Sequence, residues 1–234
     1  MSTEFRHEYK YVLDMQQSRI LEMRVRNLIP HDRNATKDGM YAIHSLYFDD
    51  YQDSCFYENE AGVNVRSKYR IRYYNNDCSY ISLEKKSKVN GMTKKESCRI
   101  TEEQCRQFMM GKIPEIHTSM SEKMQKLFSE MRCKNMIPKV IVHYDRAPYV
   151  YEIGNVRITF DRNIESSNDF VHFLDGTKVN RPILAVGESI MEVKWDEILP
   201  EFIEKGIALN ELQWSSFSKY YLCRKYNCYG GIKI

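Results

Sequence analysis

Alternation between polar and apolar residues limits what this chain of 234 residues can fold into more than any other feature of its sequence. Successive side chains of a β-strand point to opposite faces, so a period of two predicts a strand with one polar face. Eight segments have this period: residues 6–13, 44–50, 67–74, 79–88, 93–101, 139–150, 156–164 and 189–196. Asn90-Gly91 is the preferred pair for a two-residue type I′ turn, and residues 75–78 and 152–155 offer further turns. The sequence therefore predicts a mostly antiparallel meander.

Segments with helical spacing of apolar residues interrupt these strands. Thr101 and Gln104 stand in the register of a capping box, and Gly111 is suited to the end of the same helix. Met and Phe residues in 121–133 fall on one stripe, which is more typical of a core than of a cofactor site. Five helices are predicted: residues 16–29, 101–111, 121–133, 199–206 and 216–226. We expect an α+β protein with a single domain over residues 1–234.

The composition argues against several classes of protein. A net charge of +3 is too mild to indicate a nucleic-acid-binding protein. No run approaches the ~18 apolar residues of a membrane span, and the charged N-terminus has no apolar signal region. Seven cysteines without a CxxC pair predict reduced thiols in a cytoplasmic protein. The six histidines show no metal-binding spacing, so we expect them to be structural or surface residues.

Charged side chains recur at every second position of the predicted strands. Together with Lys219, these rows hold eleven cations: Arg6, Lys10, Lys68, Arg70, Arg72, Lys86, Lys95, Arg146, Arg157, Lys194 and Lys219. They hold only four carboxylates: Glu8, Glu84, Asp161 and Glu192. Lys94 is the alternative to Lys95, because a slip of one residue reverses the faces of a strand. The rows carry +7, more than the whole chain, so positive charge is gathered in them.

Two interpretations of these rows stay open. Antiparallel sheets commonly have one solvated face, so the rows could lie on the outside. The sheet could instead close into a barrel with the rows inside, which gives a polar tunnel whose apolar outer faces pack under helices. The many arginines favour the tunnel, since their planar forks bind phosphate and carboxylate oxygens. Confined cations need a polyanion, and the carboxylates suit a hard divalent cation that bridges phosphate oxygens.

The sequence resembles a known family along nearly its whole length, from about residue 4 to about residue 226. The segments that carry the resemblance are "FRHEYKYVL", "SLYFDD", "KYRIRYY", "LEKKSK", "YDRAPY", "RITFDRNI", "MEVKW" and "SKYYLCRK". Together they resemble the VTC domain, which is the catalytic domain of the vacuolar transporter chaperone polyphosphate polymerase. This domain is one of the triphosphate tunnel metalloenzymes, a CYTH-like superfamily related to CYTH adenylyl cyclases and thiamine triphosphatases.

The resemblance implies a fold, an activity and roles for the charged residues. The implied fold is an antiparallel β-barrel with flanking helices, which encloses a tunnel for the triphosphate of ATP. The implied reaction transfers the terminal phosphoryl group to a growing polyphosphate chain with Mn²⁺ or Mg²⁺. Catalytic contacts are implied for Lys10, Arg70, Arg72, Lys86, Arg146, Arg157 and Lys219. Substrate binding is implied for Arg6, Lys68, Lys95 and Lys194, and metal binding for Glu192, with Glu8, Glu84 or Asp161.

Several alternatives accompany this expectation. A triphosphatase that hydrolyses inorganic tripolyphosphate or a nucleoside triphosphate would use the same tunnel with water as the acceptor. A polyphosphate-binding module would grip the anion without chemistry, although Glu192 among the cations argues against it. Nucleic-acid binding is disfavoured, because the strand tyrosines alternate with the cations and should lie on the opposite face. The sensor domain and the membrane segment of the eukaryotic polymerase have no counterpart here, so we expect a stand-alone catalytic domain.

Overall fold

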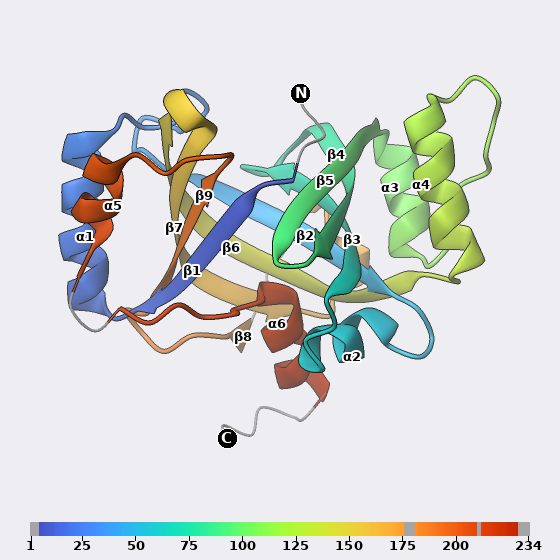
Figure 1. The fold of residues 1–234 in the computed structure, drawn as a ribbon. Coiled ribbons are helices and arrows are strands. Elements are labelled where there is room, and N and C mark those ends of the chain that lie inside the picture. Colours follow the sequence, from blue (N-terminus) through green and yellow to red (C-terminus); the bar gives the residue numbers. More distant parts are fainter. Residues whose placement is uncertain (1–4, 176–180, 210–211, 229–234) are drawn as a thin grey trace.

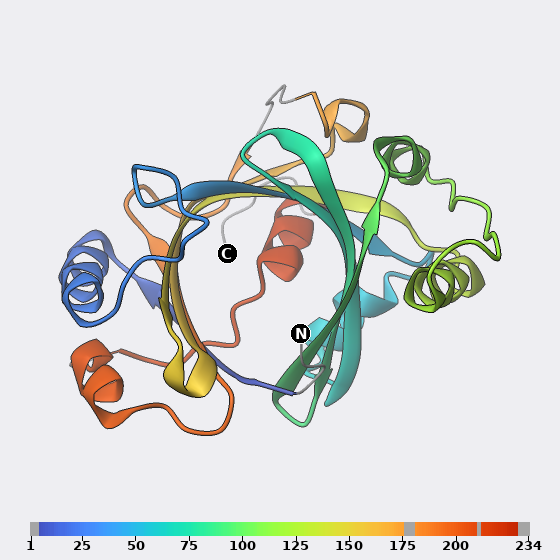
Figure 2. The ribbon, with the colours of Figure 1, turned by 90° about the horizontal axis from the view of Figure 1, so that it is seen from above.

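One antiparallel sheet, curled into a ring, dominates the computed structural model (Figures 1 and 2). The structure describes residues 5–175, 181–209 and 212–228. The strands are β1 (His7–Leu13), β2 (Tyr41–Asp49), β3 (Val65–Tyr74), β4 (Asp77–Val89), β5 (Met92–Ile100), β6 (Ile137–Tyr151), β7 (Val156–Ser167), β8 (Arg181–Pro182) and β9 (Ser189–Trp195). Their order is β1-β9-β7-β6-β2-β3-β4-β5, with β8 paired to β7, and every pair is antiparallel.

The predicted α+β class is confirmed by the helices that accompany this sheet. They are α1 (Met15–Leu28), α2 (Ser54–Glu60), α3 (Glu102–Met109), α4 (Glu122–Cys133), α5 (Glu201–Ile207) and α6 (Lys219–Cys228). Thr101 and Gln104 form the predicted capping box at the start of α3. Helix α2 was not predicted because no local capping signal precedes it, and strand β8 was not predicted because two residues are too short to show a period. No helix within the described ranges has the length and apolarity to cross a membrane.

The ring is closed by very few hydrogen bonds. Its edge strands β1 and β5 meet at one bridge, where the backbones of Arg6 and Thr93 exchange hydrogen bonds of 2.9 and 3.1 Å. Away from this bridge, residues 214–218 run beside β1, and the amide of Ser215 donates to the carbonyl of Lys10. We call residues 214–218 the closing segment. The predicted barrel is therefore a ring with one seam between β1 and β5.

Tight turns between neighbouring strands confirm the meander. Asn75 and Asn76 both have positive φ angles between β3 and β4, and so do Asn90 and Gly91 between β4 and β5. Positive φ at both central residues is the type I′ geometry, which matches the twist of the flanking strands. The long β3–β4–β5 ladder therefore folds from local signals, and its register fixes which side chains face the interior.

Helices bury the outer face of the ring on two sides (Figure 2). On one side, Leu21 of α1 and Ile203 of α5 lie in a buried cluster with Ile158 and Val193 of the sheet. On the other side, α3 and α4 cover an apolar cluster that includes Ile71, Leu83, Phe108, Phe128 and Ile141. The apolar faces that the alternation predicted are thus outside and buried, so the charged faces point into the ring.

Helix α6 lies across one end of the ring. In Figure 1 it is below the sheet, and in Figure 2 it lies within the outline of the ring. The cysteines at 55, 78, 98, 105, 133 and 223 are free, and the side chain of Cys228 lies outside the described part of the chain.

Candidate functional site

A cavity of about 250 Å³ fills the interior of the ring and is lined mainly by cations. Its lining includes all eleven cations singled out from the sequence, and Lys94 beside Lys95. They come from β1, β3, β4, β5, β6, β7, β9 and α6, so residues far apart in the sequence converge there. This placement agrees with the interpretation that the charged rows lie inside a tunnel.

The strand register sets four of the eleven cations opposite carboxylates. Lys10 faces Glu192 and Glu8 faces Lys194 across β1 and β9. Arg70 faces Glu84 across β3 and β4, and Arg146 faces Asp161 across β6 and β7. Side chains directly opposite on one face of a sheet are close enough to pair, so the backbone register itself builds these ion pairs.

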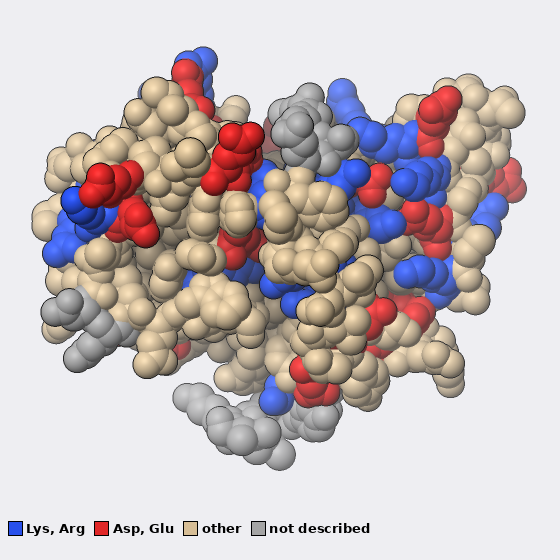
Figure 3. Space-filling view, in the orientation of Figure 1, with Lys and Arg blue, Asp and Glu red and all other residues tan. Residues whose placement is uncertain are grey.

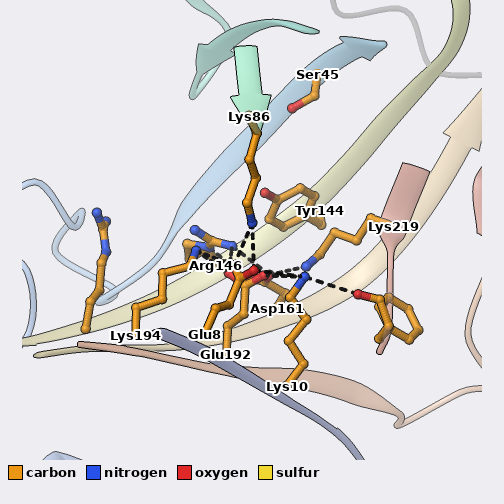
Figure 4. Close-up of polar contacts among 12 residues, drawn as sticks. Glu8, Lys10, Ser45, Lys86, Tyr144, Arg146, Asp161, Glu192, Lys194 and Lys219 are labelled. Atoms are coloured by element: carbon orange, nitrogen blue, oxygen red, sulfur yellow. Dashed lines mark hydrogen bonds and ion pairs between the residues drawn. The ribbon is translucent and has the colours of Figure 1, made fainter. Parts of the chain in front are cut away.

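Glu8, Asp161 and Glu192 come together on one wall of the tunnel (Figure 4). The Lys10 ammonium is 3.7 Å from Glu8 and 3.4 Å from Glu192, and the Lys194 ammonium is 3.2 and 2.7 Å from them. Arg146 joins the third carboxylate, with its guanidinium 2.6 Å from Asp161 and 3.4 Å from Glu192. Lys86 and Lys219 complete the group at 2.7 Å from Glu8 and 2.6 Å from Asp161.

Glu84 lies apart from that group and shares no ion-pair partner with it. Its carboxylate is 2.6 Å from Arg70 and 3.2 Å from Lys95, and Ser82 donates to it at 3.4 Å. Of the four carboxylates predicted for metal binding, the structure therefore brings three together and leaves Glu84 elsewhere in the tunnel. The pair with Glu84 also places Lys95 on the tunnel face, which is the strand phase predicted for it.

The cations keep these buried carboxylates ionised. Burial alone would raise the pKa of Glu8, but Lys10, Lys86 and Lys194 hold that pKa well below its usual value. Burial would also raise the pKa of Glu192, and Lys194, Lys10 and Lys219 outweigh it, so this pKa too is well below the usual value. The tunnel wall is thus a network of ion pairs in which every carboxylate is an anion at neutral pH.

Arg72 and Lys68 line the cavity without a carboxylate partner among the described residues. Arg72 is only 6% exposed, and its guanidinium donates to the hydroxyls of Ser45 and Tyr144 at 3.1 and 2.9 Å. The Lys68 ammonium donates to Asn59 and Ser218. Burial, with repulsion from Lys10, Lys86 and Arg66, lowers the pKa of Lys68 well below its usual value. A buried cation without a counter-charge is costly, so this arrangement is suited to an anion from outside.

The charge of Lys86 also depends on its surroundings. Burial lowers the pKa of Lys86 to about 7, because the nearby Glu8 offsets only part of the burial and Lys10 and Lys194 repel its charge. A phosphate group beside it would favour the charged form and raise this pKa.

The three grouped carboxylates are suited to bind a metal ion only when a further, phosphate-containing ligand binds with it. Within the ranges described, no group of three or more His, Cys, Asp or Glu side chains is arranged to hold a metal by itself. Glu8, Asp161 and Glu192 are each in ion pairs with at least two cations. Mg²⁺ is usually bound by one or two carboxylates together with substrate phosphates. The residues therefore fit an ion that binds with a phosphate chain.

Arg6 and Arg157 line the cavity, but the carboxylates that pair with them lie away from its centre. Arg6 pairs with Asp196 at 2.7 Å. Arg157 pairs with Asp32 at 2.9 Å and donates to the hydroxyl of Tyr41 at 2.7 Å.

Tyrosines are the lining residues that the sequence reasoning missed. Tyr69 and Tyr73 lie on the outer face of β3, as predicted, and Tyr144, which stands in the same row as Arg146, lines the cavity with that row. The tyrosines that were missed are Tyr41, Tyr47, Tyr74 and Tyr220, which also line the cavity. Strand β2 contains no cation, so the rows gave no guide to its phase, and register shifts interrupt its pairing with β6 and that of β6 with β7. The argument against nucleic acid from the tyrosines is therefore wrong for these residues.

Asp49 is a second residue that sequence reasoning missed, and it anchors α6 at the tunnel. Its carboxylate accepts hydrogen bonds from the amides of Cys55 and Phe56 at the start of α2 and from the hydroxyl of Tyr220 at 2.5 Å. Lys219, the residue before Tyr220, reaches Asp161 in the tunnel. A buried aspartate outside the charged rows thus fixes Lys219, which among the described residues is the cation that a helix contributes to the cavity lining.

Comparison with solved structures shows this fold in one protein that aligns with a TM-score above 0.5. A candidate adenylyl cyclase from Hippeastrum with a dominant triphosphatase activity aligns with a TM-score of 0.53 and 17% identity, covering 95% of each chain. A candidate adenylate cyclase from Bacillus halodurans aligns with a TM-score of 0.49 and 12% identity, over 88% of this chain and 87% of that one. A Pyrococcus horikoshii protein aligns with a TM-score of 0.49 and 14% identity, over 94% and 98%. No curated protein matches the chain significantly.

The family follows from the comparison with family models. The model of the VTC domain matches residues 5–227, which is nearly the whole sequence and includes every residue of the tunnel lining. The match, the ring of antiparallel strands and the cation-lined interior all agree with the resemblance found in the sequence, and the chain belongs to the VTC domain family.

Proposed function

We propose that this protein is a polyphosphate polymerase that binds the triphosphate of ATP in the tunnel and transfers its terminal phosphoryl group to a polyphosphate chain. The observation that supports this most is Arg72, a buried guanidinium that faces the cavity with only hydroxyl partners among the described residues. An anion with several oxygens would complete its hydrogen bonds, and phosphate matches the geometry of its fork. Membership of the VTC domain family supports the choice of polyphosphate.

The proposed catalysis relies on position and charge. Phosphoryl transfer needs little covalent chemistry from the protein, because the main tasks are to align the phosphates and to stabilise the charge on them. We assign contacts with the reacting phosphates to seven cations: Lys10, Arg70, Arg72, Lys86, Arg146, Arg157 and Lys219. Substrate binding further along the tunnel is assigned to Arg6, Lys68, Lys95 and Lys194.

The proposal includes a divalent ion, Mn²⁺ or Mg²⁺, at a single site. Glu192 would hold it together with Glu8 or Asp161, since these three carboxylates are grouped, whereas Glu84 keeps Arg70 and Lys95 in place. When bound, the ion would neutralise charge on the phosphate oxygens that it bridges. The lysines now paired with these carboxylates would then be released towards the phosphates.

A triphosphatase is the second candidate. The observation that favours it is the triphosphatase activity of the Hippeastrum protein that shares the fold. The same cations would hold the same triphosphate, with water in place of the acceptor chain. A binding module without chemistry is less well supported, because a pure anion binder gains nothing from three carboxylates on the tunnel wall.

One assay separates these functions. The purified protein is incubated with ATP and Mn²⁺, the products are run on a gel that resolves polyphosphate, and free phosphate is measured in parallel. A ladder of polyphosphate is the expected result. Free phosphate without a ladder would replace the polymerase with the triphosphatase, and tight polyphosphate binding without either product would leave the binding module.

A further inference from the structure

A second cavity, of about 70 Å³, continues from the tunnel at the seam of the ring. It shares Lys10, Lys68 and Lys86 with the main cavity and adds Arg66 and Lys88, which the sequence reasoning did not include. The closing segment, Asn59 of α2, Thr93 and the carboxylate of Glu8 form the rest of its lining. Figure 3 shows Lys and Arg atoms between uncharged residues in the middle of the face where β1 and β5 meet. We call this side cavity the seam arm.

The strand register places cations against cations in the seam arm. Across β3 and β4, Lys68 is directly opposite Lys86, and Arg66 is directly opposite Lys88. All four stand two residues apart along their strands, so they share the face that points into the ring. Like charges directly opposite each other destabilise a sheet.

The next pair along the same two strands shows the contrast. Arg70 is opposite Glu84, with 2.6 Å between guanidinium and carboxylate. In the seam arm, by comparison, no carboxylate of the described residues lies within ion-pair distance of Arg66, Lys68 or Lys88. Of the four cations in these two pairs, Lys86 alone has such a partner among the described residues, Glu8 at 2.7 Å. Along the β3–β4 ladder, the pair of a cation with a carboxylate in the main cavity is therefore followed by pairs of cations towards the seam arm.

The shape of this cluster selects a linear anion. Pairs two residues apart along a strand are separated by about 7 Å, so one small anion cannot serve both pairs at once. The two pairs continue the line of tunnel cations from Arg70, and α6 lies across the end of the ring. A chain of phosphates that leaves the main cavity would therefore turn sideways through the seam, beneath the closing segment.

We propose that the seam arm binds the units of a polyphosphate chain that extend beyond the triphosphate in the tunnel. This rests on the proposed function and adds to it a path and a selectivity for chain length. The cation pairs Lys68–Lys86 and Arg66–Lys88 hold successive stretches of the chain. Asn59 and Ser218, which now accept hydrogen bonds from Lys68, release it to the phosphates.

The test compares two ligands by calorimetry without metal: inorganic tripolyphosphate and long-chain polyphosphate. The double variant Arg66→Ala/Lys88→Ala is compared with wild type and with Lys37→Ala/Lys123→Ala, which removes the same charge from two exposed positions. In the first variant we expect the affinity for the long chain to fall about tenfold or more, and its salt dependence to weaken by about two released counterions. Tripolyphosphate should bind within about twofold of wild type.

Other outcomes overturn the proposal. Equal losses for both ligands, or no loss for the long chain, would show that the seam arm does not select length. A wild-type protein that binds neither ligand would overturn the seam arm and the proposed function together. A missing polyphosphate ladder beside intact length selectivity would overturn the polymerase alone.

A second measurement needs no ligand. Because opposed cations repel, Arg66→Ala/Lys88→Ala should raise the melting temperature of the free protein relative to the control variant. An unchanged or lower melting temperature would contradict the uncompensated repulsion on which the seam arm is based.

Discussion

The guanidinium of Arg72 donates a hydrogen bond of 2.9 Å to the hydroxyl of Tyr144, from β3 over the intervening β2 to β6. Arg70, two residues earlier on the same face, is instead held by the carboxylate of Glu84 at 2.6 Å. Two arginines in one row thus have different partners, one neutral and one charged. Their removal should therefore have different consequences.

Arg72→Ala should weaken tripolyphosphate binding with little effect on stability. The lost charge-assisted hydrogen bonds are worth about 1.5–3 kcal/mol, or roughly ten- to hundredfold in affinity. No carboxylate loses its partner, so the free energy of unfolding should change by about 1 kcal/mol or less. Calorimetry and urea unfolding measure the two quantities.

Arg70→Ala is the matched comparison and should destabilise the protein. Glu84, which is 2% exposed, would keep the largely exposed Lys95 as its one ion-pair partner among the described residues. Removal of one partner of a buried ion pair typically costs about 3 kcal/mol or more. Equal stability losses in the two variants would contradict the assignment of Arg72 as the anion-binding arginine.

Triphosphate affinity should fall as the pH rises above neutrality. The pKa of Lys86 is about 7 in the free protein, so above that pH the side chain is mostly neutral. A bound triphosphate raises this pKa, so binding takes up a proton and loses up to about tenfold in affinity per pH unit. Calorimetry between pH 6.5 and 9, about the range in which Lys86 titrates, measures this loss.

Lys86→Arg separates the titration of Lys86 from that of the ligand. Arginine stays charged throughout this range, so the variant should bind with a flatter pH profile than wild type. Titration of the phosphates affects both proteins equally. Parallel profiles would show that Lys86 does not take up the proton.

Acid should destabilise the fold through the carboxylates of the tunnel wall. The pKa of Glu192 is well below its usual value of 4.5, because Lys194, Lys10 and Lys219 outweigh the effect of burial. A lowered pKa contributes stability above pH 4.5 and loses it as the pH falls. Glu192→Gln should therefore lose less stability than wild type between pH 6 and 3, about the range of carboxylate titration, in urea unfolding.

Glu201→Gln provides the control for this experiment. Glu201 is exposed at the surface of α5 and pairs only with Lys205 among the described residues. Its variant should follow the wild-type pH profile. If Glu192→Gln follows that profile too, the ionised state of Glu192 does not stabilise the fold.

Tyr220→Phe should loosen α6 and weaken triphosphate binding. The variant removes the hydroxyl that donates to the buried Asp49, a loss of about 1–3 kcal/mol. Lys219 then becomes less well fixed beside Asp161, and the affinity for triphosphate should fall several-fold. Tyr221→Phe is the matched control, because its hydroxyl donates to the exposed Glu60, and it should change both quantities little. Equal effects of the two variants would contradict an anchoring role for Asp49.

Alternation of residues predicted the sheet and its interior because both depend on a local period. Strand β3 is the clearest example, since Lys68, Arg70 and Arg72 face the cavity while Tyr69 and Ile71 are buried outside. The chemistry of the interior could thus be inferred before any contact was known. The predicted roles of the individual residues stay predictions.

The features that were missed depend on contacts between distant residues. Helix α2 follows a residue with a positive φ, Asp53, and its amides are bound by Asp49 from another element, so no local capping signal was present. The seam arm depends on the pairing of Arg66 with Lys88, and such pairing is known only once the β3–β4 register is known. The grouping of Glu8, Asp161 and Glu192 without Glu84 likewise follows from the three-dimensional register.

The most direct test of the proposed function is the polyphosphate-resolving gel with ATP and Mn²⁺, run on wild type, Arg72→Ala and the surface control Lys37→Ala. We expect a ladder from wild type and from Lys37→Ala, and none from Arg72→Ala at equal protein concentration. A ladder of unchanged intensity from Arg72→Ala, or no ladder from wild type, would contradict phosphoryl transfer in the tunnel.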